Sequence, residues 1–562
     1  MFYKLIALNA RYVYSCLALF YVRYGLEENI PECQPDIVQF TINDPYYPTL
    51  RRIASEEPAA LFFSVYIWNS SYIQRLVCDL VKLLPDTPII LGGPQAGPLV
   101  QILQPHVCQR CTVVHGEIEG IEESFYRDLK EKKLQRTYDR KNRASFKLPY
   151  RQDDFAGPLQ NRHIYYESSR GCPFGCTYCL SASENGVRHL KSSQVFDEIK
   201  SILQYSPKVI RFVDRTFNDH PERALEIWRF LVEQPGDTLF HFEMAPDRFT
   251  EEMFQFLKQV SPGRFQFEIG VQSTNPKTLG AINRKCDLTK LGSNIRKLTA
   301  LDTIHLHLDL ILGLPHESRE SFVRSFADVF ALEPHYIQMG LLKILPDTPI
   351  SKSIKEYGLV VCENPPYELL ENKWLDKSEF EDLFWFGECV EAFFNNRYFR
   401  SLWNYLCKVE KDIFLFFDLL LTLCHEKRFF ELAPTQELLS SLLFEATRER
   451  TDKELIRELL VFDWLRCGHR FLPGHLEQES PSIQKKNLWK RLPLSLDGLY
   501  DYKNRDEFFR QGVFVEFSGQ FLYEVRLPYE GQSAYVCFTA ARENTVFKHN
   551  KTVLIPASIP GS

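Results

Sequence analysis

The chain has 562 residues, of which 44% are hydrophobic and 25% are charged, and its formal net charge is −6. This balance is ordinary for globular proteins, and the length predicts roughly three or four domains. The slight negative charge excludes the strongly basic footprint of a polyanion-binding chain. The one basic stretch, from Lys130 to Lys147, is interpreted as a solvated linker.

The start of the chain, Met1 to Asn9, is apolar like a buried strand. It lacks the charged beginning and the cleavage site of a signal peptide. No apolar run approaches the length of a membrane helix, because Asp418 interrupts the longest one. We therefore expect a cytoplasmic protein that binds neither a membrane nor nucleic acid. Its fifteen cysteines should stay reduced there, which favours metal ligation over a disulfide framework.

Residues 1–130 alternate short apolar segments with segments of helical period. This alternation predicts an α/β domain with a doubly wound parallel sheet, whose ligands bind beyond the carboxyl ends of the strands. The expected strands are 3–8, 37–41, 59–65, 88–91 and 112–114, and the expected helices are 14–24, 48–55, 71–84, 98–104 and 121–130.

The alternation stops between 131 and 160, where charge, proline and glycine show no clear period. It resumes with six further strand candidates, too few for a closed eight-stranded barrel, so we expect a partial (β/α)6 barrel. The sequence pattern then becomes helical from about residue 365 and strand-like from about residue 505, which predicts an α+β extension. The barrel strands are expected at 163–168, 209–213, 239–244, 264–271, 305–312 and 336–344.

These changes of pattern predict the division of the chain into domains. Residues 1–133 form the doubly wound domain, 134–160 the linker, 161–350 the partial barrel, and 351–562 a mostly helical extension that ends in strands.

Three cysteines, Cys172, Cys176 and Cys179, lie within eight residues with the spacing CxxxCxxC, directly after the first barrel strand. Thiolates are soft ligands that suit iron–sulfur clusters or zinc. A [4Fe–4S] cluster held by three of them keeps one iron without a protein ligand, which indicates catalysis. Pro173 and Gly175 permit the tight path that brings the thiolates together.

Other interpretations of the three cysteines are weaker. A disulfide cannot use three thiols. Zinc requires a fourth ligand, and neither His163 nor His189 sits at a usual offset. Cys108, Cys111 and His115 suggest a second metal site, but two small residues flanking a buried strand are the favoured interpretation there.

The cysteine loop and the strands around it resemble the radical SAM superfamily, and the matches cover about 190 residues. Tyr178 fits the aromatic residue that commonly precedes the third cysteine. The sixth-strand match departs from the pattern, with Asp347 where glycine is commoner. The matching motifs are Phe-Val-Asp-Arg-Thr-Phe-Asn at 212–218, Phe-Glu-Ile-Gly-Val-Gln-Ser at 267–273 with Leu-Gly-Ala-Ile-Asn-Arg at 279–284, Leu-Asp-Leu-Ile-Leu-Gly-Leu-Pro at 308–315, and Leu-Lys-Ile-Leu-Pro-Asp-Thr-Pro at 342–349.

The front domain resembles the cobalamin-binding domain of the same subgroup, through residues 64–69, 91–94 and 115–119. Gly92 and Gly93 would let the backbone approach a bulky flat ligand, and Ser64 and Asn69 would hydrogen-bond its tail. Alternatively, Ser64 and Asn69 cap a turn and a helix, and the glycines form a tight turn.

The DxHxxG loop, with which many cobalamin domains supply a lower-face histidine, is absent. The loop after the first strand instead reads Asn-Ala-Arg-Tyr-Val-Tyr-Ser-Cys at 9–16. Related radical SAM enzymes also lack that motif, so cobalamin stays an expected cofactor while its lower ligand stays open.

The resemblance implies that Cys172, Cys176 and Cys179 hold three irons and that S-adenosylmethionine chelates the fourth. One electron then cleaves the sulfonium to give methionine and a 5′-deoxyadenosyl radical, which removes hydrogen from an inert carbon. A donor such as flavodoxin or ferredoxin would supply the electron. The resemblance implies S-adenosylmethionine contacts from Tyr178, Asp214, Thr216, Glu243, Glu268 and Arg284.

Two enzymatic functions follow from the resemblance, with a small-molecule or peptide substrate. The favoured one is cobalamin-dependent methyl transfer to an unactivated carbon. The other is a radical rearrangement or cyclisation without methyl transfer, and a third hypothesis is a non-enzymatic cobalamin or redox sensor. Residues 351–562 resemble the C-terminal extension, of no assigned role, found in some cobalamin-type radical SAM proteins.

Overall fold

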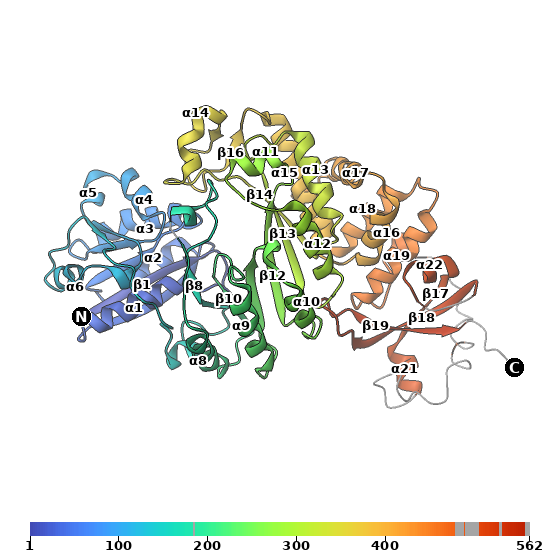
Figure 1. Cartoon of the computed structure of the whole chain (residues 1–562), viewed down its shortest axis with the longest axis horizontal. Coiled ribbons are helices and arrows are strands. Elements are labelled where there is room, and N and C mark those ends of the chain that lie inside the picture. Colours follow the sequence, from blue (N-terminus) through green and yellow to red (C-terminus); the bar gives the residue numbers. More distant parts are fainter. Residues whose placement is uncertain (184–185, 478–487, 489–504, 528–530, 557–562) are drawn as a thin grey trace. The chain divides into compact units, whose positions relative to one another are not determined.

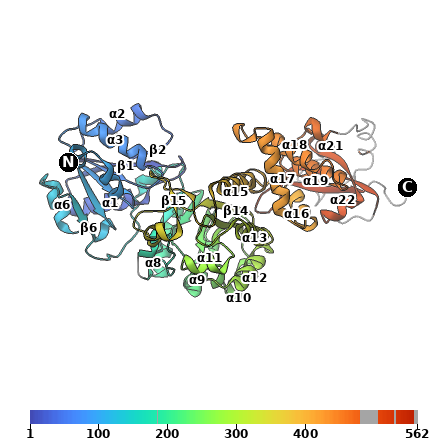
Figure 2. The same cartoon turned by 90° about the horizontal axis from the view of Figure 1, so that it is seen from above.

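The computed structural model describes residues 1–183, 186–477, 488, 505–527 and 531–556. Figures 1 and 2 show the whole chain in two views. The chain divides into two compact units. The first unit contains Met1–Thr250, Ile282–Lys285 and Leu342–Asn372, and the second contains Glu251–Ala281, Cys286–Leu341 and the residues from Lys373 onward.

The first unit begins with a six-stranded parallel sheet whose strand order is β2-β1-β3-β4-β5-β6. Nearly every residue of β1 is buried, as expected for a parallel strand covered on both faces. The elements of this part are β1 (Phe2–Asn9), α1 (Leu17–Asn29), β2 (Gln34–Thr41), α2 (Tyr46–Ala54), β3 (Ala60–Ser64), α3 (Ser70–Leu83), β4 (Ile89–Gly92), α4 (Ala96–Ile102), α5 (Pro105–Cys108), β5 (Cys111–His115), α6 (Glu123–Lys130) and β6 (Thr137–Asp139).

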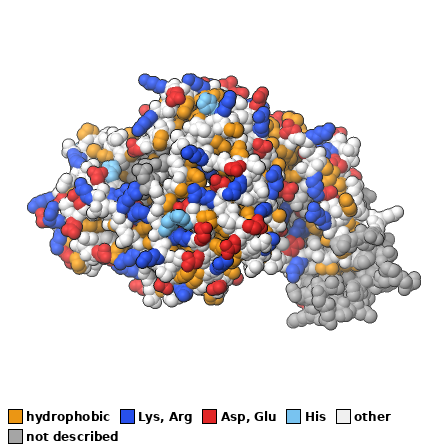
Figure 3. Space-filling model, viewed as in Figure 1, with side chains coloured by type: hydrophobic (Ala, Val, Ile, Leu, Met, Phe, Trp, Pro, Cys, Tyr) orange, Lys and Arg blue, Asp and Glu red, His pale blue; other side chains and the backbone are white. Residues whose placement is uncertain are grey.

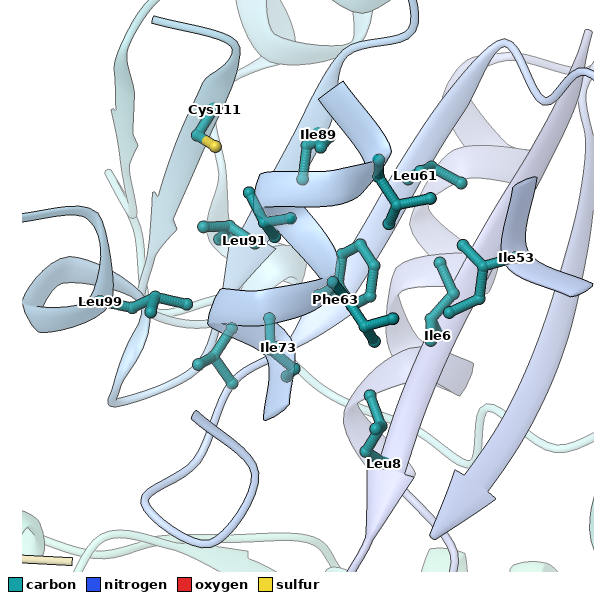
Figure 4. Packing of buried hydrophobic residues seen from close by; sticks show 14 of the residues in the cluster. Ile6, Leu8, Ile53, Leu61, Phe63, Ile73, Ile89, Leu91, Leu99 and Cys111 are labelled. Atoms are coloured by element: carbon teal, nitrogen blue, oxygen red, sulfur yellow. The ribbon is translucent and has the colours of Figure 1, made fainter. Parts of the chain in front are cut away.

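Helices cover both faces of this sheet. Helices α2, α3 and α4 pack on one face, where Ile6, Phe63 and Leu91 meet Ile53 and Ile73 in a hydrophobic core (Figure 4). Helices α1 and α6 contact each other and lie on the other face (Figure 2). The predicted doubly wound sheet is confirmed.

We expected an irregular linker between residues 131 and 160, but the structure has a strand, β6, and a helix, α7 (Gln152–Ala156), in this range. The expectation of irregular structure was wrong for these residues. Strand β6 extends the sheet by pairing in parallel with β5, and α7 follows it. Within β6 only Tyr138 is buried. A three-residue strand with one buried position is too short to produce a periodic signal.

Cys111, the first residue of β5, belongs to the same hydrophobic core as Ile6 and Phe63 (Figure 4). Its Sγ is 3.5 Å from the carbonyl oxygen of Val107, whereas His115 is exposed. The interpretation of Cys108 and Cys111 as small residues flanking a buried strand therefore agrees with their packing.

The rest of the first unit contains three parallel barrel strands in the order β7-β10-β11. A short antiparallel pair, β8 and β9, lies between β7 and α8 in the chain. The elements are β7 (Ile164–Tyr166), β8 (Ser169–Arg170), β9 (Arg188–His189), α8 (Ser192–Leu203), β10 (Val209–Phe212), α9 (Pro221–Glu233), β11 (Leu239–Met244), α14 (Ile354–Tyr357), β15 (Val360–Val361) and β16 (Leu369–Glu371).

The second unit contributes the next three parallel strands, β12, β13 and β14. In β12 and β13 every second residue is buried, and the intervening residues, which include Glu268, His307 and Asp309, are half-buried. This alternation gives each strand one apolar and one largely polar face, as in a barrel with a polar interior. The elements are α10 (Glu251–Leu257), β12 (Phe265–Gln272), α11 (Pro276–Ala281), α12 (Leu288–Thr299), β13 (His305–Leu312), α13 (Arg319–Phe330) and β14 (Tyr336–Leu341).

The C-terminal extension is helical and then forms an antiparallel sheet with the order β17-β18-β19 (Figure 1). The predicted fold class, with a doubly wound domain, a second parallel sheet and an α+β extension, is therefore confirmed. The elements are α15 (Lys377–Val390), α16 (Arg400–Val409), α17 (Ile413–Glu426), α18 (Gln436–Thr447), α19 (Lys453–Arg466), α21 (Arg505–Gln511), β17 (Val513–Ser518), α22 (Gly519–Glu524), β18 (Ser533–Arg542) and β19 (Asn550–Pro556).

Acidic and basic side chains are interspersed on the face shown in Figure 3, in keeping with the small net charge. Within the described ranges, no helix is both long enough and apolar enough to cross a bilayer.

Candidate functional site

The three-cysteine loop leaves β8 and returns through β9, and the antiparallel pairing of these two strands closes its neck. Gly171, at the exit of β8, has a φ of +97°. A Cβ there would lie 2.1 Å from the carbonyl oxygen of Gly186. Only glycine fits at position 171, where the chain leaving β8 passes close to the backbone of Gly186. This glycine therefore permits the narrow neck of the loop that carries the three thiols.

The thiols of the loop influence one another electrostatically. Cys176 is buried, and Cys172 and Cys179 are half-buried. Burial raises the pKa of the Cys172 thiol, and the neighbouring Cys179 and Cys176 raise it further. The thiolate, rather than the thiol, binds metals. At this position a free thiolate is unfavourable, and a bound metal ion would neutralise its negative charge.

The segment Ile282–Lys285 follows the fourth-strand motif and packs on the cysteine loop. The backbone N–H of Thr177 donates to the carbonyl of Ile282 at 3.0 Å, and Asn283 Nδ2 donates to the carbonyl of Gly175 at 2.9 Å. Arg284 follows directly, and its Nη1 lies 3.7 Å from the Sγ of Cys176. A cation is thereby held against one predicted cluster ligand.

Two further residues border the loop from the β10–α9 and β11–α10 connections. Thr216 Oγ1 lies 3.7 Å from the Sγ of Cys172. Arg248 lies over the ring of Phe174 at 5.3 Å, and Arg284 lies over the same ring at 5.6 Å. The loop therefore has a hydroxyl and two guanidinium groups around it, which suits thiolate-rich chemistry.

Asp214, a predicted S-adenosylmethionine contact, is fully buried and engaged elsewhere. Its carboxylate accepts hydrogen bonds from the backbone N–H of Ser168 at 2.9 Å and from the hydroxyls of Ser168 and Ser169 at 2.6 Å each. Burial raises the pKa of Asp214, and these hydrogen bonds counteract the rise. The residue anchors the backbone just ahead of the cysteine loop.

The remaining predicted contacts are distributed over both units. Tyr178 is half-buried, and burial together with Cys176 raises its pKa. Glu243 is half-buried on β11, where its carbonyl accepts from the N–H of Phe217 at 2.9 Å. Glu268 is half-buried on β12 of the second unit. The first unit thus brings Tyr178, Thr216 and Arg284 to the cysteines.

Sequence reasoning missed the role of Arg170, which lies two residues before Cys172. Its Nη2 is 2.7 Å from carboxylate oxygens of both Glu119 and Glu167, and its Nη1 is 3.5 Å from Glu117. Burial alone would lower the pKa of Arg170, but Glu167 and Glu119 more than offset this and raise the pKa. The loop after β5 is therefore tied to the strand that enters the cysteine loop.

A second group of predicted residues meets at the carboxyl ends of β3 and β4, where Ser64 pairs with Gly92. Gly93 has a φ of +100°, and a Cβ there would lie 2.6 Å from the carbonyl oxygen of Val65. At Gly92 a Cβ would meet nothing closer than 4.0 Å. The fold itself thus requires glycine at 93 but leaves open space at 92.

Asn69 stabilises a turn, as one part of the alternative expected, but its side chain does not cap helix α3. Its Oδ1 accepts from the N–H of Tyr66, and its Nδ2 donates to the carbonyls of Leu8 and Ser64. At the same edge, the rings of Tyr66 and Trp68 stack at 4.4 Å, and Trp68 is 47% exposed. Tyr66 is half-buried, so only Trp68 is presented to solvent; neither ring was assigned a role from the sequence, although both lie within the motif at 64–69.

Two family profiles match the chain. Residues 166–329 match the radical SAM superfamily, and residues 355–498 match a family described as a protein of unknown function (DUF4080). The first range contains the cysteine loop and most of the barrel strands, and the second falls in the C-terminal extension.

The chain is similar to curated methyltransferases. It is 27% identical to 2-(S-pantetheinyl)-carbapenam-3-carboxylate methyltransferase of Streptantibioticus cattleyicolor, over 62% of this chain and 59% of that protein. It is 25% identical to the cobalamin-dependent radical SAM methyltransferase TokK of Streptomyces tokunonensis, over 54% of this chain and 50% of TokK. The chain therefore spans only 50% to 59% of the length of these two relatives.

Two solved structures have a similar fold. The cobalamin-dependent S-adenosylmethionine radical enzyme OxsB, with aqua-cobalamin and S-adenosylmethionine bound, aligns with a TM-score of 0.56 at 14% identity, over 83% of this chain and 78% of OxsB. The radical S-adenosylmethionine methyltransferase TsrM of Kitasatospora setae aligns with a TM-score of 0.52 at 16% identity, over 64% of this chain and 79% of TsrM. The chain thus contains a radical SAM domain, is homologous to cobalamin-dependent radical SAM methyltransferases, and carries a C-terminal extension.

Proposed function

We propose that this chain is an enzyme that reductively cleaves S-adenosylmethionine at a [4Fe–4S] cluster and transfers a methyl group from cobalamin to an unactivated carbon. The observation that carries the proposal is the gathering of Cys172, Cys176 and Cys179 on one constrained loop, with Arg284 beside the middle thiol. The curated relatives, both methyltransferases by name, support methyl transfer.

The donor set fits a cluster better than zinc. Three thiols in a partly buried loop supply three soft ligands and leave one iron open. The two histidines weighed as a fourth zinc ligand have other surroundings: His189 Nε2 lies 3.3 Å from a carboxylate oxygen of Asp219, and the ring of His163 packs on Tyr14 at 5.7 Å.

In this proposal Cys172, Cys176 and Cys179 hold the cluster. When bound, the cluster supplies the electron that cleaves the sulfonium of S-adenosylmethionine, and cobalamin supplies the methyl group. Arg284 and Thr216 face two of the sulfur atoms, where a donor or a positive charge stabilises added electron density. Asp214 and Arg170 hold the backbone that enters the loop, so Asp214 acts as a positioning residue rather than a contact.

Glu243 and Glu268 remain proposed contacts for S-adenosylmethionine, and Tyr178 stays the aromatic neighbour of Cys176. The proposed cobalamin-binding site is the edge of the sheet at the carboxyl ends of β3 and β4. The open space at Gly92 and the exposed face of Trp68 offer a place for a flat macrocycle. Ser64, Asn69 and Gly93 shape the two loops of this edge through the contacts described above.

Radical SAM enzymes need an electron donor, and we propose a flavodoxin or a ferredoxin for this chain. Such a donor delivers one electron at a time, which matches the cleavage step. The substrate class proposed is a small molecule or a peptide, because the polar faces of β12 and β13 offer hydrogen-bonding groups.

The test is an assay of the anaerobically reconstituted full-length chain with dithionite and S-adenosylmethionine carrying a labelled methyl group. We expect 5′-deoxyadenosine and methionine from molecules of S-adenosylmethionine that are cleaved, and a methyl label on added cobalamin with S-adenosylhomocysteine from molecules that donate their methyl group. The Cys176→Ala variant should form no 5′-deoxyadenosine, because that product requires the cluster. Absence of 5′-deoxyadenosine from the wild-type chain, with its iron bound, would overturn the proposed enzyme and favour the sensor hypothesis.

The same assay separates the two enzymatic functions once a substrate is supplied. Methyl transfer should give S-adenosylhomocysteine and labelled product. Formation of 5′-deoxyadenosine without S-adenosylhomocysteine would instead indicate a rearrangement or cyclisation.

A further inference from the structure

His189, Asp219 and His220 gather at the beginning of α9, outside the cysteine loop. His189 is the last residue of β9, whereas Asp219 and His220 end the connection from β10 to α9. One ligand atom of each residue lies within 4.8 Å of the other two. The two imidazole rings are 4.9 Å apart at an angle of 73°.

Two polar atoms of this cluster, on Asp219 and His189, are buried and lack hydrogen-bond partners among the described residues. The Asp219 side chain is only 6% exposed. Its Oδ1, together with Nδ1 of His189, is buried without a hydrogen-bond partner among the described residues. Leaving such groups unsatisfied is costly, so a buried carboxylate oxygen and a buried imidazole nitrogen in one cluster call for a ligand.

A simple ion pair between His189 and Asp219 explains only part of this arrangement. It accounts for the 3.3 Å between His189 Nε2 and Asp219 Oδ2, but it leaves Oδ1 and Nδ1 unsatisfied. It also gives no role to His220, which occupies the N-cap position of α9 without capping it through its side chain.

We propose that His189, Asp219 and His220 bind a divalent transition-metal ion. Two imidazole nitrogens and one carboxylate oxygen are the donor set that Zn²⁺ and Fe²⁺ accept in proteins, with further positions left for water. His220 is exposed, so an ion and its water ligands reach the site from solvent.

The location gives this ion a positioning role. Strand β9 pairs with β8 through the register Ser169↔His189, so His189 sits at the neck of the cysteine loop. The β10–α9 connection that carries Asp219 and His220 also carries Thr216, which faces Cys172. The ion therefore fastens the returning end of the cysteine loop to the segment that lines it.

The test uses the reconstituted full-length chain and Zn²⁺ as the probe, titrated against a chromophoric chelator. We expect about one Zn²⁺ per chain, and X-ray absorption at the zinc edge should show nitrogen and oxygen neighbours with imidazole scattering. The zinc edge does not report the iron cluster, so the two sites are measured separately.

The variant His220→Ala removes an exposed ligand and should weaken zinc binding by roughly 100-fold or more, since loss of even an outer-shell partner costs about 10–100-fold. Asp219→Asn is the second variant and should behave alike. His106→Ala, which removes another exposed histidine, should bind zinc as the wild type does. Sulfur neighbours at the zinc edge, or equal zinc affinity in His220→Ala and wild type, would overturn the proposal.

This inference does not rest on the proposed function. A chain that binds zinc at His189, Asp219 and His220 but fails to cleave S-adenosylmethionine would sink only the enzyme proposal. A chain that cleaves it normally yet binds no zinc would sink only the metal site.

Discussion

The guanidinium of Arg284 lies 3.7 Å from the Sγ of Cys176, although 108 residues separate the two in the chain. The contact forms because Asn283 and Ile282 bind the backbone of the cysteine loop on either side of Cys176. A positive charge is thereby fixed against the most buried of the three thiols.

Arg284→Ala should lower the reduction potential of the reconstituted cluster. Hydrogen bonds and positive charge near the sulfurs favour the reduced, more negative cluster. A lost contact worth about 1 kcal/mol corresponds to a shift on the order of 50 mV for one electron. The shift is measured by redox titration with electron paramagnetic resonance. Arg248→Ala is the matched control, because Arg248 also lies over Phe174; an equal shift in both variants would contradict the specific role of Arg284.

Cys176→Ala should abolish retention of a four-iron cluster, because two thiolates cannot replace three at this site. Iron and sulfide analysis after anaerobic reconstitution provides the measurement. Cys78→Ala, at a half-buried position on α3, should keep the full iron content. Four irons per chain in Cys176→Ala would show that the ligand assignment is wrong.

Arg170→Met should destabilise the first unit, because it removes the cation that Glu119 and Glu167 share. Glu117 also loses Arg170 but keeps Arg140 and Arg188. Removing one partner of a buried ion cluster costs about 3–5 kcal/mol. The free energy of unfolding is measured by denaturant titration. Lys82→Met breaks an exposed pair with Asp79 and should cost about 1 kcal/mol or less. An equally small effect at Arg170 would mean that the cluster is solvated.

Gly92→Ala and Gly93→Ala should differ in what they damage. At Gly93 the positive φ and the nearby Val65 carbonyl make any side chain strained, so the melting temperature should fall. At Gly92 there is room within the chain, so the melting temperature should hold while cobalamin binding weakens. Cobalamin retention is followed by its visible absorption after desalting. Unchanged retention in Gly92→Ala would place the cofactor away from this glycine.

Asp463→Asn should flatten the pH dependence of stability. Asp463 is fully buried on α19, where its carboxylate accepts from the N–H of Leu402 at 3.0 Å, and burial raises its pKa to about 6. Between about pH 4 and 6 the folded chain therefore holds the proton that the unfolded chain has lost, so the free energy of unfolding falls as pH rises. The fall attributable to this group is on the order of 3 kcal/mol.

The asparagine keeps a carbonyl oxygen for Leu402 but has no proton to lose. Denaturant titrations of both proteins across about pH 4 to 7 should therefore converge toward acid and diverge toward neutrality, with the variant the more stable at neutral pH. A constant difference between the two proteins at every pH would show that Asp463 does not titrate in this range.

Several features of the fold follow from local pattern. The strands of the doubly wound sheet were predictable because parallel strands buried on both faces are nearly continuous apolar runs, as β1 is. Barrel strands β12 and β13 were predictable from their strict alternation. Strand β6 was missed because its pairing with β5, rather than its own three residues, makes it a strand.

For the candidate site, the sequence by itself predicted Cys172, Cys176 and Cys179 as cluster ligands, because ligand spacing within one loop is a local property. Only the tertiary structure decided which distant partners serve that loop. Arg170 forms ion pairs with Glu117 and Glu119, which follow strand β5 of the doubly wound sheet. The carboxylate of Asp214 accepts a hydrogen bond from Ser168, and His189 pairs with Asp219. Such pairings depend on which strand ends meet in space, and that is set by the packing of the whole sheet rather than by the residues that flank each partner.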